Sequence, residues 1–120
     1  MEINTKFRSI NGFTVGNEDG IVVKLLTPCG LEYSNGHDSI LLSMDESYDI
    51  DMVLTFLVYL PEKIRWRNSG EALLKEGTNQ MKQHIRAALR MFGEFTLFIP
   101  RDPSEIENVR TRSEEDYYIH

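Results

Sequence analysis

Two places in the chain carry residues that could take part in nucleophilic or acid–base chemistry. His37 is followed directly by Asp38, and a histidine oriented by a carboxylate acts as a general base when a nucleophile or a water lies beside it. Cys29 stands between Pro28 and Gly30, a turn context that can expose a thiol. A small hydrolase or isomerase using these residues is therefore one hypothesis, and unreactive turn residues are the alternative.

The spacing of the remaining candidate ligands indicates neither a metal site nor a phosphate-binding loop. The three histidines and the single cysteine form no CxxC, HxH or HExxH pattern. The acidic stretch at residues 45–51 lacks the glycine and the distal glutamate of an EF-hand loop. Gly12, Gly16 and Gly20 have the wrong spacing for the common phosphate loops. We therefore predict a protein that is not an enzyme, with no catalytic residues, no metal and no cofactor.

The charge balance favours a protein partner over a nucleic acid. Nineteen acidic against thirteen basic residues give a net charge of −6, whereas binding to a phosphate backbone needs a lysine and arginine footprint. Carboxylates around an aromatic side chain suit a basic protein surface, and a solvated loop is the alternative. The predicted partner-binding residues are Asp45, Glu46, Tyr48, Asp49 and Asp51, with Glu18 and Asp19 in an early turn as a second group.

The cysteine count and the first residues predict a cytoplasmic protein. One cysteine cannot form an intramolecular disulfide, and the start MEINTKFRSI lacks the basic-then-apolar pattern of a secretory signal. The longest apolar stretch, residues 52–60, is shorter than the about 20 residues that a helix needs to cross a bilayer. No membrane anchor is expected.

The elements that position these residues are predicted to be mainly strands, because short β-branched and aromatic stretches alternate with turn signals. The stretches are residues 10–15, 21–27, 31–33, 39–44, 52–60, 64–66 and 94–99. Asn35-Gly36 predicts a tight hairpin with a positive φ at both residues, and 45–51 predicts a solvated loop. Residues 52–60 are apolar on both faces and predict a central strand. Trp66 is expected in the core, with outward arginines on either side.

Residues 78–92 are predicted to form the one helix, since their apolar positions recur every three or four residues. Thr78 fits an N-cap and Gly93 a C-terminal glycine cap. The predicted class is α+β, a mainly antiparallel sheet of about five to seven strands with the helix on one face and the other face open. Residues 1–100 are expected to form a single domain, and 101–120 a polar, acidic tail that is flexible or loosely docked.

Residues 39–99 resemble a family of small immunity proteins from bacterial polymorphic-toxin systems, including contact-dependent growth inhibition. The resembling pieces, in chain order, are SILLSMDES, MVLTFLVYL, IRW and QMKQHIRAALRMFG leading into a strand. The resemblance implies a bacterial inhibitor that binds its cognate toxin, often a nuclease, and blocks the active site. Because a nuclease attracts a polyanion, its cleft is basic, and an acidic inhibitor complements it.

A different class of function stays open beside the inhibitor. A groove between the helix and the sheet would suit a regulatory or adaptor module that binds a small molecule or a peptide, and such a module needs no catalytic residue. Homodimerisation through a sheet edge is compatible with each hypothesis.

Overall fold

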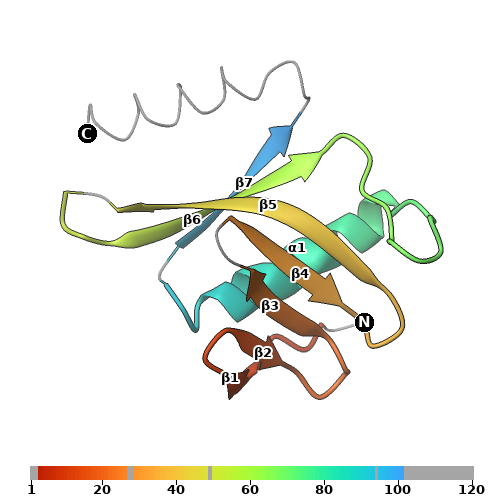
Figure 1. The fold of residues 1–120 in the computed structure, drawn as a ribbon, viewed down its shortest axis with the longest axis horizontal. Coiled ribbons are helices and arrows are strands. Elements are labelled where there is room, and N and C mark those ends of the chain that lie inside the picture. Colours follow the sequence, from red (N-terminus) through yellow and green to blue (C-terminus); the bar gives the residue numbers. More distant parts are fainter. Residues whose placement is uncertain (1–2, 27–28, 49, 94, 102–120) are drawn as a thin grey trace.

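The computed structural model describes residues 3–26, 29–48, 50–93 and 95–101 and contains one seven-stranded sheet with a helix across one face (Figure 1). The strands follow one another across the sheet in chain order. They are β1 (Arg8–Asn11), β2 (Thr14–Gly16), β3 (Val22–Leu26), β4 (Gly30–Ser34), β5 (Ser39–Tyr48), β6 (Leu54–Pro61) and β7 (Phe95–Arg101). The predicted α+β class is confirmed, since the described residues form six neighbouring antiparallel strands, a seventh strand and one helix.

The last strand joins the sheet in a different way from the others. β7 runs parallel to β6, and a parallel neighbour requires a crossover connection rather than a hairpin. Residues 62–74 and helix α1 (Lys75–Leu89) supply that crossover. Since β5 and β7 flank β6, the predicted strand is internal to the sheet, but it spans 54–61 rather than 52–60 because Met52 and Val53 precede it. The strands β1 and β7 form the two edges of the described sheet.

The core lies between α1 and the face of the sheet that it covers. Side chains alternate across each strand, so β5 sends Ile40, Leu42 and Met44 toward the helix while the residues between them face the other way. The helix contributes the predicted stripe, buried at Met81, Ile85, Ala88 and Leu89. In the described part of the chain no helix lies on the second face of the sheet, which we call the uncovered face (Figure 1).

Both predicted helix caps are wrong. The helix begins at Lys75 after Leu74, which makes no side-chain capping bond, and Thr78 lies inside the first turns. Gly93 lies beyond the helix, and its φ is not positive, as a left-handed glycine cap would require. Its role is one of space, because a Cβ at this position would lie 2.6 Å from Cε2 of Phe56. Only a glycine lets the chain pass this close to the sheet.

Three predicted strand boundaries are also corrected. The stretch 10–15 is split into β1 and β2, with Asn11 paired to Thr14 across a two-residue turn. At the Asn35-Gly36 hairpin only Gly36 has a positive φ, and the loop spans the four residues between Ser34 and Ser39. The Asn35 side-chain oxygen accepts hydrogen bonds from the backbone amides of the last two loop residues. The predicted loop at 45–51 begins as sheet, since β5 continues to Tyr48.

The predicted tail falls largely outside the described residues. Arg101 still belongs to β7, and residues 102–120 lie beyond the part of the chain that the structure describes. Among the described residues, no helix has the length and hydropathy needed to cross a bilayer.

Candidate functional site

The acidic segment predicted to bind a partner forms the far end of the β5–β6 hairpin, which extends past the other strands (Figure 1). Because β5 is a strand here, its acids do not share one face. Asp45 lies on the uncovered face of the sheet, and Glu46 and Tyr48 alternate to the face that carries the helix. Asp51 lies in the turn at the tip, and Asp49 lies outside the described residues.

Asp45 is held in place by a tyrosine of the next strand. The Tyr59 hydroxyl donates a 2.7 Å hydrogen bond to Oδ2 of Asp45, and the two residues are diagonal neighbours, since Asp45 pairs with Leu57 and Ser43 pairs with Tyr59. The Tyr59 ring is buried on this face. The carboxylate is therefore positioned by the sheet.

Large apolar side chains accompany these acids at the same end of the sheet. Ile50 is 91% exposed and Met52 is 73% exposed at the tip, and Tyr48 is half exposed beside them. The start of β7 adds Phe95 and Leu97, more than half exposed, which pair in register with Thr55 and Leu57 of β6. We name the hairpin-end surface as Asp45, Glu46, Tyr48, Ile50, Asp51, Met52, Phe95 and Leu97.

The apolar members of the hairpin-end surface did not emerge from the sequence. Ile50 stands between two aspartates, and this placement of an apolar residue in an acidic turn was the local signal for it. Phe95 and Leu97 could not be placed there, because only the parallel pairing of β7 with β6 brings them to the hairpin. Isolated exposed apolar residues are common, but a cluster of them marks an interaction surface.

Met52 carries the one positive φ of a non-glycine residue in the described chain, at 62°. This left-handed conformation costs an ordinary residue about 1–2 kcal/mol. The strain coincides with a highly exposed side chain, so the turn holds Met52 outward at a cost in stability. Strain of this kind is concentrated at functional positions.

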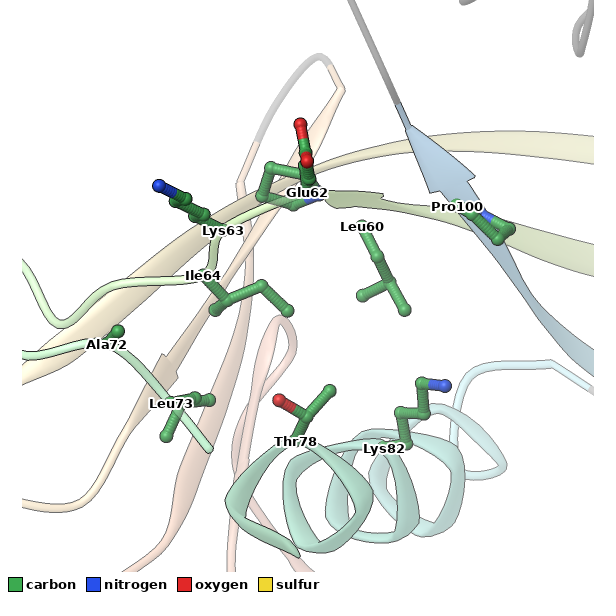
Figure 2. Close-up of a pocket in the computed structure, with 10 residues that line it drawn as sticks. Leu60, Glu62, Lys63, Ile64, Ala72, Leu73, Thr78, Lys82 and Pro100 are labelled. Atoms are coloured by element: carbon green, nitrogen blue, oxygen red, sulfur yellow. The ribbon is translucent and has the colours of Figure 1, made fainter. Parts of the chain in front are cut away.

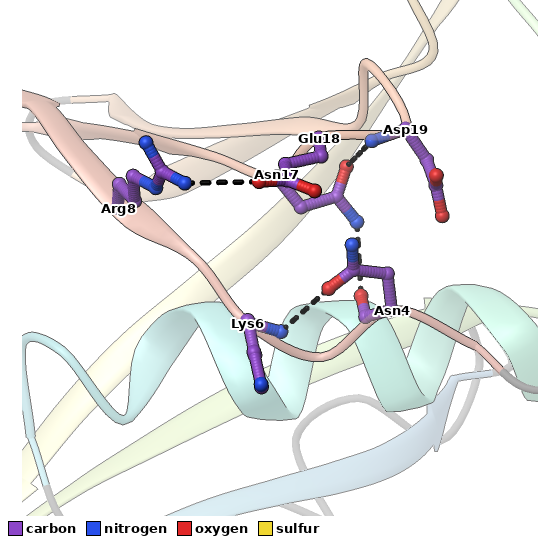
Figure 3. Close-up of polar contacts among 6 residues, drawn as sticks. All are labelled: Asn4, Lys6, Arg8, Asn17, Glu18 and Asp19. Atoms are coloured by element: carbon purple, nitrogen blue, oxygen red, sulfur yellow. Dashed lines mark hydrogen bonds and ion pairs between the residues drawn. The ribbon is translucent and has the colours of Figure 1, made fainter.

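Glu18 and Asp19, the second predicted group, lie far from the hairpin-end surface. Their turn joins β2 to β3 beside the β4–β5 loop, where Gly20 approaches Asn35, whereas the acids of β5 lie at that strand's other end. Glu18 forms a 2.9 Å ion pair with Arg8 (Figure 3). The structure therefore does not bring the two predicted groups together.

Asn17 organises that early turn. Its side-chain oxygen accepts the amides of Asp19 and Ile21, and its amide nitrogen donates to the carbonyl of Asn4 at 2.9 Å. Figure 3 shows this residue between the turn and the first described residues of the chain. The polar groups here satisfy one another, which indicates a structural role for the turn.

The histidine–acid pair is divided by the fold. Asp38 accepts backbone N–H bonds from Asn68 at 2.8 Å and Ser69 at 2.9 Å and so fastens the loop after Trp66. Partial burial by itself raises the pKa of the Asp38 carboxyl, but these bonds, with a further one from the Ser39 amide, outweigh it and lower the pKa below its ordinary value. The Asp38 carboxylate therefore bonds to the loop after Trp66 rather than orienting His37, which is exposed.

Cys29 is also separated from the histidines. It is exposed and lies just before β4, whereas His37 follows the other end of that strand. The convergence of His37, Asp38 and Cys29 that a hydrolase would require is not present in the described chain. No group of histidine, cysteine and acidic side chains that could hold a metal occurs among the described residues.

His84 forms a buried polar contact that the sequence did not indicate. Its Nδ1 lies 2.8 Å from the Tyr33 hydroxyl, and the two rings stack at 5.8 Å. Burial lowers the pKa of His84, partly opposed by the Asp19 carboxylate, and burial raises the pKa of Tyr33 to about 12. Both groups are neutral near pH 7, and the contact connects the helix to β4.

Trp66 lies at the rim of the core rather than within a strand. It is half-buried, and its ring centroid lies 6.1 Å from that of Tyr33. Arg65 and Arg67 on either side are exposed, as expected. In place of the predicted strand at 64–66, an isolated bridge joins Arg65 to Ala72.

Comparison with protein-family models, with curated proteins and with solved structures found no match for this chain. The resemblance to immunity proteins therefore stays a prediction.

Proposed function

We propose that this protein is an immunity protein that binds a cognate toxin domain and inhibits it through the hairpin-end surface. The observation that carries the proposal is the cluster of exposed apolar side chains with carboxylates at one end of the sheet. Protein interfaces combine an apolar centre with a polar rim. An aromatic, an isoleucine and a methionine projecting from one hairpin supply anchors of the kind on which affinity depends.

The charge of this surface selects a basic partner. The described part of the surface carries three carboxylates and no lysine or arginine, in a protein with a net charge of −6. Such a field speeds association with a basic protein and repels nucleic acid. A nuclease toxin presents a basic cleft, and an acidic hairpin that enters it would block the substrate without a catalytic step.

The fold suits an inhibitor that is rigid before it binds. Asp45 is positioned by Tyr59, and the hairpin extends from two strands that each have a neighbour on both sides. Preorganised groups lose less conformational entropy when they bind. The uncovered face, with Leu57 and Leu97 in one row beside Asp45, continues the contact area away from the tip.

The proposal predicts that a toxin domain is encoded immediately upstream of this gene, and that domain provides the test. Co-expression of the full chain should restore growth to cells that produce the domain, and the purified proteins should form a complex at micromolar concentration. The matched controls are Ile50→Ser, on the hairpin-end surface, and Ile10→Ser, exposed on β1. Protection lost with the first variant and kept with the second supports the proposal, whereas absence of a complex overturns it.

A further inference from the structure

A pocket of about 540 Å³ opens at the other end of β6, away from the hairpin-end surface. The crossover connection builds it, because β6 ends in Leu60 and Pro61, β7 reaches it with Pro100, and the helix adds Thr78 and Lys82. Its size lies within the range of about 300–1,000 Å³ that is typical of small-molecule sites. Nothing in the proposed inhibitor requires this pocket.

The interior of the pocket is apolar with two polar groups on one side. In Figure 2, Leu60 extends from the sheet toward the helix, and Ile64 and Leu73 close the side formed by the connection. Thr78 and Lys82 rise from the helix beneath them. Glu62 and Lys63 point away from the space. A ligand would therefore meet a mainly apolar wall, which includes Leu60, Ile64 and Leu73, together with one hydroxyl and one ammonium.

Among the described residues, neither polar side-chain group forms a hydrogen bond or an ion pair, and the Lys82 ammonium contacts an aromatic ring. Neither described ion pair involves Lys82, whose Nζ lies 5.9 Å from the centroid of the Phe98 ring. No side-chain hydrogen bond of Thr78 occurs in the described chain, and the helix starts one turn earlier without a side-chain cap. An ammonium at the edge of an apolar pocket, with no carboxylate partner in the described chain, favours an anionic ligand.

The place of the pocket in the fold agrees with this chemistry. β6 and β7 are the one parallel pair of the described sheet, and the pocket lies where both strands end. In sheets with crossover helices, ligands bind outside the carboxyl ends of parallel strands.

We propose that this pocket binds a small amphipathic carboxylate. The carboxylate accepts hydrogen bonds from the Lys82 ammonium and the Thr78 hydroxyl, and the apolar part of the ligand packs on Leu60, Ile64 and Leu73. Apolar walls supply most of the affinity, and the charged group sets the orientation and the preference for an anion.

Octanoate, octanol and octylammonium are the probes, since they share one chain and differ in the charge of the head group. Isothermal titration of the full-length protein should give saturable binding of octanoate with a Kd below about 1 mM. Octanol should bind about tenfold more weakly and octylammonium more weakly still, and NMR should report shifts at the Ile64 and Leu73 methyl groups. Absence of saturable octanoate binding overturns the proposal.

Two variants test the assigned polar groups. Lys82→Met retains the length of the side chain and should remove the preference for octanoate over octanol, and Thr78→Val should weaken octanoate binding several-fold. Arg90→Met is the control, because Arg90 is a cation just after the same helix and does not line the pocket. Equal octanoate binding by the wild type and Lys82→Met, or equal losses in Lys82→Met and Arg90→Met, would rule out this site.

Discussion

The Tyr59 hydroxyl and the Asp45 carboxylate are joined by a 2.7 Å hydrogen bond on the uncovered face of the sheet. This bond turns an acid at the end of a strand into a group with a fixed position. We expect Tyr59→Phe to lower the free energy of unfolding by about 0.5–1.5 kcal/mol, because the change leaves the ring in place and removes the donor. Urea denaturation measures the effect. Tyr48→Phe alters an exposed hydroxyl, and an equal loss in that variant would contradict the assigned role of Tyr59.

Gly93→Ala should destabilise the protein by about 1–3 kcal/mol, since overpacking forces neighbouring groups to move. The added Cβ would lie 2.6 Å from Phe56 and 2.9 Å from Leu54. Gly12→Ala is the matched control, because nothing lies within 4 Å of a Cβ at that position. Denaturation midpoints compare the two variants, and similar stabilities for both would show that the close approach of Gly93 carries no constraint.

Stability should fall on acidification through the titration of His84. Burial lowers the pKa of the folded-state histidine, with Asp19 acting in the opposite direction, so the folded protein binds protons less readily than the unfolded chain. The stabilising difference is complete above the ordinary pKa of about 6.5 and declines as the pH falls toward the lowered value. Denaturation curves between pH 8 and pH 5, as an approximate range, measure this slope.

His84→Gln should flatten that slope, and His37→Gln should leave it unchanged because His37 is exposed in the β4–β5 loop. Removing the imidazole also removes the contact with Tyr33, so His84→Gln is expected to be less stable at pH 8 as well. A wild-type slope that survives in His84→Gln would assign the pH dependence to other groups.

Asp38→Ala should loosen the loop after Trp66, because the amides of Asn68 and Ser69 lose their acceptor. Hydrogen exchange of these amides should become faster, while exchange in α1 stays slow. Acidification should produce the same change in the wild type, since the pKa of Asp38 is lowered and its contribution is lost as the pH falls through that value. Unchanged exchange at residues 68 and 69 would show that the loop is held by other contacts.

The sequence was sufficient to predict the strands and the helix whose apolar side chains recur at regular spacing and pack in the core. Met81, Ile85 and Leu89 recur at helical spacing, and all three are buried. The helix ends were misplaced because Thr78 and Gly93 have cap-forming chemistry, whereas packing decided the start of the helix and a close approach to Phe56 required the glycine. Local capping signals do not report such long-range contacts.

The candidate site was predicted only in part, for a related reason. Acids at 45–46 suggested a loop, yet a strand with one uncovered face and an exposed end tolerates charge, so β5 continues through them. Alternation then separates Asp45 from Glu46. Phe95 and Leu97 join this surface through pairing between β6 and β7, and no pattern within either segment encodes that register.

The most direct test of the central claim is a titration of the full chain, at low and high salt, into the purified toxin domain that the proposal predicts beside this gene. We expect a one-to-one complex that weakens with salt, because carboxylates meet a basic surface. Ile50→Ser should weaken binding at least about tenfold, since it removes an anchor, and Ile10→Ser should leave binding unchanged. Equal affinities for the wild type and Ile50→Ser, or a complex that salt does not affect, would contradict inhibition through the hairpin-end surface.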